Sequence, residues 1–292
     1  MNTDVESATP ALCRLQLGKE LRNLRLRAGL TSTQVVRKLF WSPSKLTRLE
    51  TGENLVVEPS DIMALCQIFE ADAETTAMLK GYAAVTKTKR DWWQSSEYRP
   101  VIPPGFKAYL GLEATATTLH NYESEYVPGL LQTEAYVRAI YERAHQGLGE
   151  EEISRMIAVR MTRQEALHRE SPLKFAAIFS ESVLRRRVGG SAVTRGQLAH
   201  IAEIASLPNV RVQVVPFAAG AHPGMDGAFH TLQFHDRDAL KPIIYFENLA
   251  DTWVSRRQSD VELHEEAFSE LQALAPGPQE SLSMIKKAMK EH

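Results

Sequence analysis

Residues 30–52 constrain the fold more than any other stretch, because they carry the signals of two short helices joined by a tight turn. Ser42 is a favourable N-cap, and Pro43 fits the first helical position because no N–H is needed there. Gly52 is a residue that readily ends a helix in the left-handed conformation. The sequence therefore predicts a second helix from about residue 43 to residue 51.

This predicted helix has one apolar face and one polar face. Leu46 and Leu49 lie three residues apart, so they share the inner face. The outward residues all carry groups that hydrogen-bond to phosphates or base edges. They are Ser44, Lys45, Thr47 and Arg48. A short helix with this outer face is suited to the major groove of DNA.

Basic residues are concentrated around the same segment. Between Arg14 and Arg48 the chain has nine Lys or Arg residues and one acid, Glu20, although the net charge of the whole chain is −2. Taken alone, such a run also fits the solvated face of a helical bundle. Because the motif and the positive charge fall on the same residues, we predict that this region binds double-stranded DNA.

The run over residues 41–52, Trp-Ser-Pro-Ser-Lys-Leu-Thr-Arg-Leu-Glu-Thr-Gly, resembles the Cro/C1 (Xre-type) helix-turn-helix family in the form seen in actinobacteria. The resemblance implies an all-α domain of five helices over about residues 12–86. It also implies that a first helix, at about residues 12–28, braces the sugar-phosphate backbone, while Ser44 and Arg48 read the major groove.

Ten residues are predicted to contact DNA. Base reading is assigned to Ser44 and Arg48, and the flanking residues are expected mainly to hold phosphates. The full set is Arg22, Arg25, Thr31, Ser32, Lys38, Ser42, Ser44, Lys45, Thr47 and Arg48.

One residue departs from the pattern of the family. The family usually has glycine in the turn between the two helices, where this chain has Phe40. A bulky side chain is strained if that position requires a positive φ angle. Either the turn is reshaped, or Phe40 serves as an apolar plug.

At 292 residues, the chain is long enough for two domains. Residues 1–11 are expected to be disordered, and their acids and lack of an apolar core argue against a signal peptide. Prolines and aromatic residues over 87–108 indicate a semi-rigid linker, with Trp92 and Trp93 available to dock against the next domain. No run of 18 apolar residues is present, so no membrane span is expected.

Residues 109–292 mix helical and strand patterns, which predicts an α/β domain. The alternation over 210–216 is typical of a half-buried strand, with Arg211 and Gln213 on its polar face. Other strands are predicted at 173–179, 228–235 and 242–247, and helices at 112–122, 133–145, 150–170, 182–187, 194–206, 260–275 and 280–290. The predicted fold class is multi-domain: an all-α five-helix Cro/C1-type domain followed by a mixed α/β regulatory domain.

The second part also resembles a known group of proteins, through residues 126–136, 160–164, 181–190, 208–217 and 227–229. It is similar to the uncharacterised domain fused to helix-turn-helix modules in WhiJ-like, antitoxin-like regulators of Streptomyces and other actinobacteria. The resemblance implies a regulator that is often accompanied by a small acidic partner protein encoded nearby. It implies neither a ligand nor a reaction.

The sequence contains no complete catalytic constellation, so we do not expect an enzyme. The run from His264 to Phe268 begins like a zinc-protease motif but has Phe where the second His must stand. No cofactor or metal is expected, and Cys13 and Cys66 are interpreted as small buried hydrophobic residues. A ligand pocket at the strand ends is a further hypothesis, and the same residues are also explained as structural side chains. They are Glu181, His222, Asp226 and Glu247.

Arginines are frequent on the predicted helices at 150–170 and 182–187. Such residues are suited to an acidic partner protein or an anionic effector. The candidates are Arg155, Arg160, Arg163, Arg185 and Arg186. The alternative is a solvated face on which neighbouring glutamates act as ion-pair partners.

Together these patterns predict a cytoplasmic, nucleoid-associated transcriptional regulator that binds operator DNA as a homodimer. Its second domain is expected to respond to a partner protein or a small effector. The alternative is an antitoxin-like protein that sequesters a small acidic partner and autoregulates its own operon. The sequence leaves the operator, the sign of regulation and the effector open.

Overall fold

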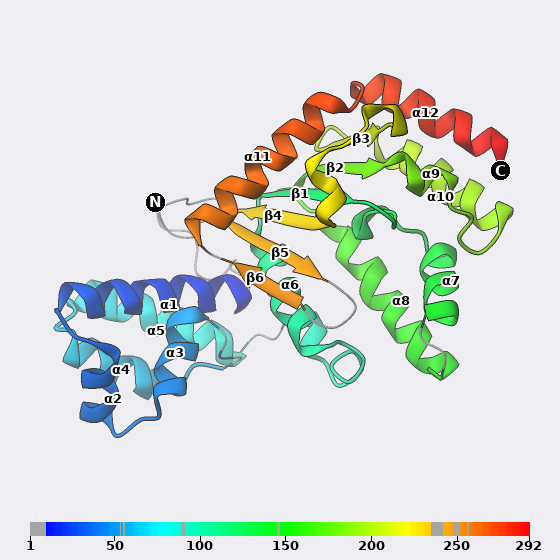
Figure 1. The fold of residues 1–292 in the computed structure, drawn as a ribbon. Helices are drawn as coiled ribbons and strands as arrows, with labels where there is room; N and C mark the ends of the chain where they lie inside the picture. Colours follow the sequence, from blue (N-terminus) through cyan, green and yellow to red (C-terminus); the bar gives the residue numbers. More distant parts are fainter. Residues whose placement is uncertain are drawn as a thin grey trace. The chain divides into compact units, whose positions relative to one another are not determined.

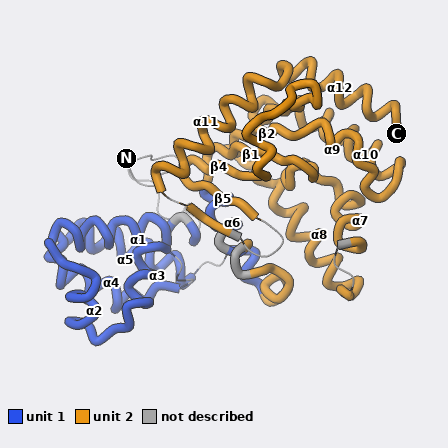
Figure 2. Tube along the Cα trace, viewed as in Figure 1, with its two compact units in different colours: residues 1–95, 107–115, 235–240 blue, residues 96–106, 116–234, 241–292 orange. Residues whose placement is uncertain are grey.

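The structure is a computed structural model that describes residues 10–52, 54, 56–88, 91–144, 147–234, 242–247, 252–255 and 257–292. Most of the segment predicted to be disordered, residues 1–9, lies outside this description, whereas residues 10 and 11 are helical. The chain divides into two compact units (Figure 2). The first comprises residues 1–95, 107–115 and 235–240, and the second comprises 96–106, 116–234 and 241–292. No helix in the described part of the chain is long and apolar enough to cross a membrane.

Five helices make up most of the first unit, as the sequence predicts (Figure 1). They are α1 (Pro10–Arg27), α2 (Ser32–Leu39), α3 (Pro43–Thr51), α4 (Pro59–Ile68) and α5 (Ala73–Thr88). The bounds of α3 match the prediction, because proline before the helix and glycine after it are strong local signals.

One apolar core holds these helices together. Leu17 and Leu21 of α1 and Leu46 and Leu49 of α3 are all buried in it. Gly18 lies so near α3 that a Cβ atom there would stand 2.5 Å from the carbonyl oxygen of Leu49. Burial of each leucine contributes about 2 kcal/mol, so the core fixes α3 against α1.

The predicted linker, residues 87–108, is more structured than expected. It contains the 3₁₀ turn η1 (Trp92–Gln94) and the start of α6 (Pro104–Thr115). Trp93 is buried within the first unit, and its ring lies 3.9 Å from the position of a Cβ at Gly111 of α6. Trp93 thus lies against a residue of the predicted second domain, 109–292, but the structure groups that part of α6, residues 107–115, with the first unit.

A buried ion pair ties this segment to α1. The Nη2 atom of Arg14 donates to Oδ2 of Asp91 at 3.0 Å, and both side chains are almost inaccessible. Burial raises the pKa of Asp91, while the charge of Arg14 opposes that rise. The pair holds the start of η1 against α1, so this segment is not a free linker.

A six-stranded mixed sheet organises the second unit, which confirms the predicted fold class (Figure 1). The strand order is β3-β2-β1-β4-β5-β6; β1, β2 and β3 are parallel, and the later strands pair antiparallel. The strands are β1 (Thr118–Glu123), β2 (Lys174–Ser180), β3 (Val210–Val215), β4 (Phe229–Gln233), β5 (Ile243–Glu247) and β6 (Thr252–Ser255).

Two strands and one burial pattern differ from the predictions. Strand β1 lies where the sequence predicts a helix over 112–122, and β6 is not predicted at all. The helix ends before the β-branched Thr117 and Thr118, and β1 then pairs with both β2 and β4. In β3, Gln213 is buried rather than exposed, because its amide donates to the carbonyl of Pro276 at 3.0 Å.

Helices cover both faces of this sheet. Phe268 and Leu271 of α11 pack with Tyr122 and Ile178 on one face, and α7 and α8 lie on the opposite side (Figure 1). Helix α12 packs against β3 and α10. The remaining elements are η2 (Gly129–Leu131), α7 (Glu134–Ala144), α8 (Glu150–Gln164), η3 (Glu165–Leu167), α9 (Glu181–Arg185), α10 (Ser191–Ile204), η4 (Phe217–Ala219), η5 (Pro223–Asp226), α11 (Gln258–Leu274) and α12 (Pro278–Glu291).

Candidate nucleic-acid interface

Helix α2 begins with a capping box. The N–H of Gln34 donates to Oγ1 of Thr31 at 3.2 Å, and the N–H of Thr31 donates to Oε1 of Gln34 at 2.8 Å. Thr31, Ser32 and Gln34 are all exposed. This start leaves an exposed helix N-terminus, whose partial positive charge favours phosphate. The sequence analysis does not name Gln34, although the Thr-x-x-Gln spacing is the sequence signal of a capping box.

The turn between α2 and α3 keeps the geometry that glycine would give. Phe40 has φ 56° and ψ 36°, and the N–H of Trp41 donates to the carbonyl of Val36 at 2.9 Å. The Phe40 residue is 96 % exposed. The suggestion of an apolar plug is therefore wrong, and the turn is not reshaped: a bulky residue occupies the left-handed position.

Helix α3 presents a polar row to solvent. Leu46 and Leu49 are each 1 % exposed, so they anchor the helix as predicted. Ser44, Thr47 and Arg48 are exposed on the other side. Ser42 occupies the N-cap position without capping the backbone, because its Oγ instead lies 3.1 Å from Oγ of Ser44.

Arg48 is held in place by a residue that the sequence analysis missed. Its Nε atom donates to Oδ1 of Asn54 at 3.3 Å. This contact leaves the two terminal nitrogens of the guanidinium group for a base or a phosphate. Asn54 lies two residues after Gly52, which ends α3, and no local pattern marks it as a neighbour of Arg48.

Arg25 is not available to DNA, which corrects its assignment as a phosphate contact. Its guanidinium group donates to both carboxylate oxygens of Glu50, at 2.6 and 2.9 Å, and to the carbonyl of Leu30 at 3.0 Å. The side chain is nearly buried, and the bond to Glu50 raises its pKa. Arg25 therefore joins α1 to α3 as a structural residue.

Lys45 is also engaged within the protein. Its ammonium group bonds to Oδ1 of Asp61 at 2.8 Å and lies 3.9 Å from the centre of the Trp41 ring. Both interactions offset its charge. Lys45 is therefore held within the first unit, which corrects its assignment as a DNA contact.

Other predicted cations remain open to solvent. Arg22 on α1 and Lys38 on α2 are exposed, and the described residues include no acidic partner for either. Arg37 on α2 is likewise exposed, although the sequence analysis does not predict it as a DNA contact. These three side chains are the ones suited to phosphates.

The structure shows no contact among the described residues that would bring the four candidate pocket residues of the second unit into one cavity. Glu181 accepts from Arg185 and from the N–H of Phe217, and Glu247 accepts from the Tyr245 hydroxyl at 3.0 Å. The ring of His222 stands edge-on to that of Tyr122, and Asp226 is exposed on η5. The alternative interpretation, that these side chains are structural, accounts for Glu181 and Glu247.

The arginines proposed for an acidic partner make contacts within the protein. Arg155 pairs with Glu151, Arg185 with Glu181 and Glu291, and Arg186 with Glu125. Arg163 is 5 % exposed and lies 5.0 Å from the centre of the Phe106 ring, and Arg160 lies 5.9 Å from it. These residues therefore do not form the free basic patch that the sequence suggested.

Comparison with known protein families gives one match in the N-terminal part of the chain and one in the rest. A helix-turn-helix domain matches residues 16–79, so the chain carries the fold of a DNA-binding regulator. A domain of unknown function, DUF5753, matches residues 106–287, which is more than half of the chain, and the chain belongs to that family. The combination is consistent with an Xre-like regulator. No curated protein and no solved structure matches the chain.

Proposed function

We propose that this chain is a transcriptional regulator that reads operator DNA through α3. The observation that carries the proposal is the exposed row Ser44, Thr47 and Arg48 on the outer side of α3. Buried Leu46 and Leu49 hold this row outward. Hydroxyl groups bond to base edges, and an arginine pairs in bidentate fashion with O6 and N7 of guanine.

Neighbouring cations support the proposal. Arg22, Arg37 and Lys38 are exposed on α1 and α2, the two helices that precede the helix proposed to read bases. Such residues neutralise phosphates without selecting a sequence, and they make binding depend on salt. Specific and nonspecific contacts therefore come from different side chains.

The test separates these two kinds of contact. Operators are first selected from random duplex DNA with the full-length chain. Arg48→Ala should then weaken operator binding by about 1–3 kcal/mol and relax the preference at one base position. Binding to random DNA should change little. Arg187→Ala, an exposed arginine of the second unit, is the matched control and should change neither affinity. Equal losses on operator and random DNA would show that Arg48 is not a base reader.

We further propose that the second unit forms the homodimer and places the regulator under the control of a partner protein or a small effector. The support is the resemblance to antitoxin-like regulators and the size of the second unit, which exceeds what DNA reading by α3 requires. The protein would act on chromosomal DNA in the cytoplasm, without catalysing a reaction.

A further inference from the structure

Phe40, in the turn between α2 and α3, combines two unfavourable features. Its backbone is left-handed, with φ 56°, a region in which a residue with a Cβ atom is strained and glycine is not. The residue is also 96 % exposed, so its ring gains nothing from burial within the chain. Strain of this kind persists where the surrounding structure enforces it, and it is concentrated at functional sites. The turn therefore points to a role for the ring outside the fold.

The apolar neighbours of Phe40 in sequence are held by the protein. Leu39 and Trp41 are partly buried and pack against the core of the first unit. The ammonium group of Lys45 lies over the Trp41 ring, 3.9 Å from its centre. Within this turn, Phe40 is therefore the apolar side chain that remains open to solvent.

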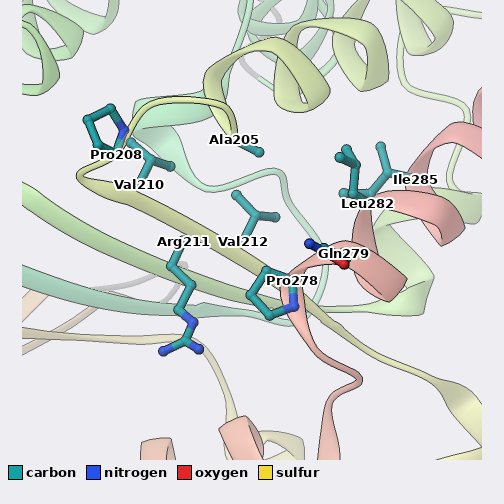
Figure 3. Close-up of a pocket in the computed structure, with 9 residues that line it drawn as sticks. All are labelled: Ala205, Pro208, Val210, Arg211, Val212, Pro278, Gln279, Leu282 and Ile285. Carbon is teal, nitrogen blue, oxygen red and sulfur yellow. The ribbon is translucent and has the colours of Figure 1, made fainter.

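An apolar surface of the second unit provides a contrast. Val212 of β3 lines a cavity of about 380 Å³ together with Leu282 and Ile285 of α12 (Figure 3). Helix α12 packs against β3, and Val212 is only 3 % exposed. The apolar side of β3 is thus covered by the chain itself, whereas Phe40 is open to a molecule from outside.

The turn adjoins the end of α3 that would enter the major groove. Phe40 shortly precedes Ser42, the N-cap of α3, and Ser44 in its first turn. In helix-turn-helix proteins the N-terminal residues of the recognition helix contact base edges, while the preceding helix crosses the backbone of the DNA. On the other side of Phe40 in sequence, Arg37 and Lys38 are exposed in the last turn of α2. The ring therefore stands between groups suited to phosphates and groups suited to bases.

We propose that Phe40 contacts the C5-methyl group of a thymine in the major groove, at the edge of the sequence that α3 reads. The inference rests on DNA reading by α3 and adds one base position to it. Thymine is the base that carries this methyl group, and phenylalanine is one of the side chains that make apolar contact with it. The row Ser44, Thr47 and Arg48 offers mainly polar groups, so Phe40 supplies a large apolar surface that the row lacks.

This contact accounts for a residue that strains its own turn. In the free chain the ring is in water, whereas on DNA it would be removed from water together with the methyl group. Phe40→Gly relieves the strain at this position, so it should not lower the stability of the chain, yet it should weaken operator binding. Opposite effects on stability and binding are expected of a residue that serves function at the expense of stability.

The test combines removal of the ring with removal of the methyl group. Operators are selected from random duplex DNA with the full-length chain, and each thymine of the selected site is replaced in turn by deoxyuridine, which lacks only the C5 methyl. At one thymine, this replacement should weaken binding by the unchanged chain about fourfold, as expected for one buried carbon. Phe40→Ala, which retains the Cβ atom, should weaken binding to the thymine operator by at least about the same factor and should no longer distinguish thymine from deoxyuridine there. Fluorescence anisotropy of the labelled duplex measures each affinity.

Phe217→Ala is the matched control, because Phe217 is an exposed phenylalanine of the second unit. It should keep both the operator affinity and the dependence on the methyl group. Thermal unfolding is measured on the same variants, and Phe40→Gly takes the place of Phe40→Ala in the comparison if the alanine variant is not folded at the temperature of the assay.

Unchanged operator affinity of Phe40→Ala would overturn the contact. A loss that is equal with thymine and with deoxyuridine at every position would also overturn it, because the ring would then lie against the sugar-phosphate backbone. Either result, together with a base-selective loss in Arg48→Ala, leaves DNA reading by α3 intact. Failure of the full-length chain to select any operator would instead remove the DNA-binding proposal and this inference with it.

Discussion

At the scale of single residues, Arg22 and Arg25 show that position on a helix does not decide the role of an arginine. They lie three residues apart on α1, yet Arg22 is exposed and Arg25 is held by Glu50 and the carbonyl of Leu30. A nearly buried ion pair of this kind is costly to break, because the remaining partner keeps an uncompensated charge. The two residues should therefore fail in different ways when they are replaced.

We expect Arg25→Ala to lower the free energy of unfolding by about 3 kcal/mol, because Glu50 loses its partner in a nearly buried site. The measurement is denaturant unfolding of the full chain. Arg22→Ala, on the same helix, should change stability by less than about 0.5 kcal/mol but should reduce the salt dependence of DNA binding by about one unit of slope. The reverse pattern would return Arg25 to the DNA interface and remove Arg22 from it.

At the scale of elements, the turn between α2 and α3 has a local conformation that its sequence disfavours. Phe40 adopts a positive φ angle and exposes its ring to solvent. A residue with a Cβ atom in this region costs roughly 1 kcal/mol or more. The hydrogen bond from the N–H of Trp41 to Val36, and the burial of Leu46 beyond the turn, maintain the geometry in spite of that cost.

Phe40→Gly should therefore stabilise the chain by about 0.5–1 kcal/mol, after the greater freedom of glycine in the unfolded state is taken into account. Thermal unfolding of the full chain measures the change. Phe40→Ala is the matched control: it removes the ring but retains the Cβ atom, so it should give no such gain. Destabilisation by both substitutions would mean that the ring makes a stabilising contact.

At the scale of the whole molecule, the first unit offers one short helix, α3, for the base reading proposed above. Single modules of this size bury a small surface on DNA, and helix-turn-helix proteins commonly read two half-sites as dimers. The second unit, with its six-stranded sheet, has two sheet edges, β3 and β6. A homodimer would supply a second copy of α3 for the second half-site.

We accordingly expect light scattering to give twice the chain mass of 32.7 kDa. Selected operators should contain two half-sites whose centres lie one helical turn, roughly 34–36 Å, or a multiple of it, apart. Arg48→Ala should remain dimeric, because it changes only the outer face of α3. A monomeric mass both free and on DNA would refute the dimer.

Much of the first unit was predictable because its signals are local. Ser42, Pro43 and Gly52 mark the ends of α3 within the segment itself, and Leu46 and Leu49 define its inner face by their spacing. Capping, proline geometry and helical periodicity all act between residues within a few positions of one another. The outward orientation of the base-reading candidates followed from the same local rules.

Only the tertiary structure decided which polar groups are available. The partner of Arg25 lies 25 residues away, and the carbonyl that binds Gln213 lies 63 residues away. Strand β1 likewise depends on neighbours from β2 and β4, whose pairing no local pattern reveals. Local rules determine where a helix begins and which side is apolar, whereas exposure of a charge or a strand edge depends on which distant residues pack against it, and that is determined only when the whole chain folds.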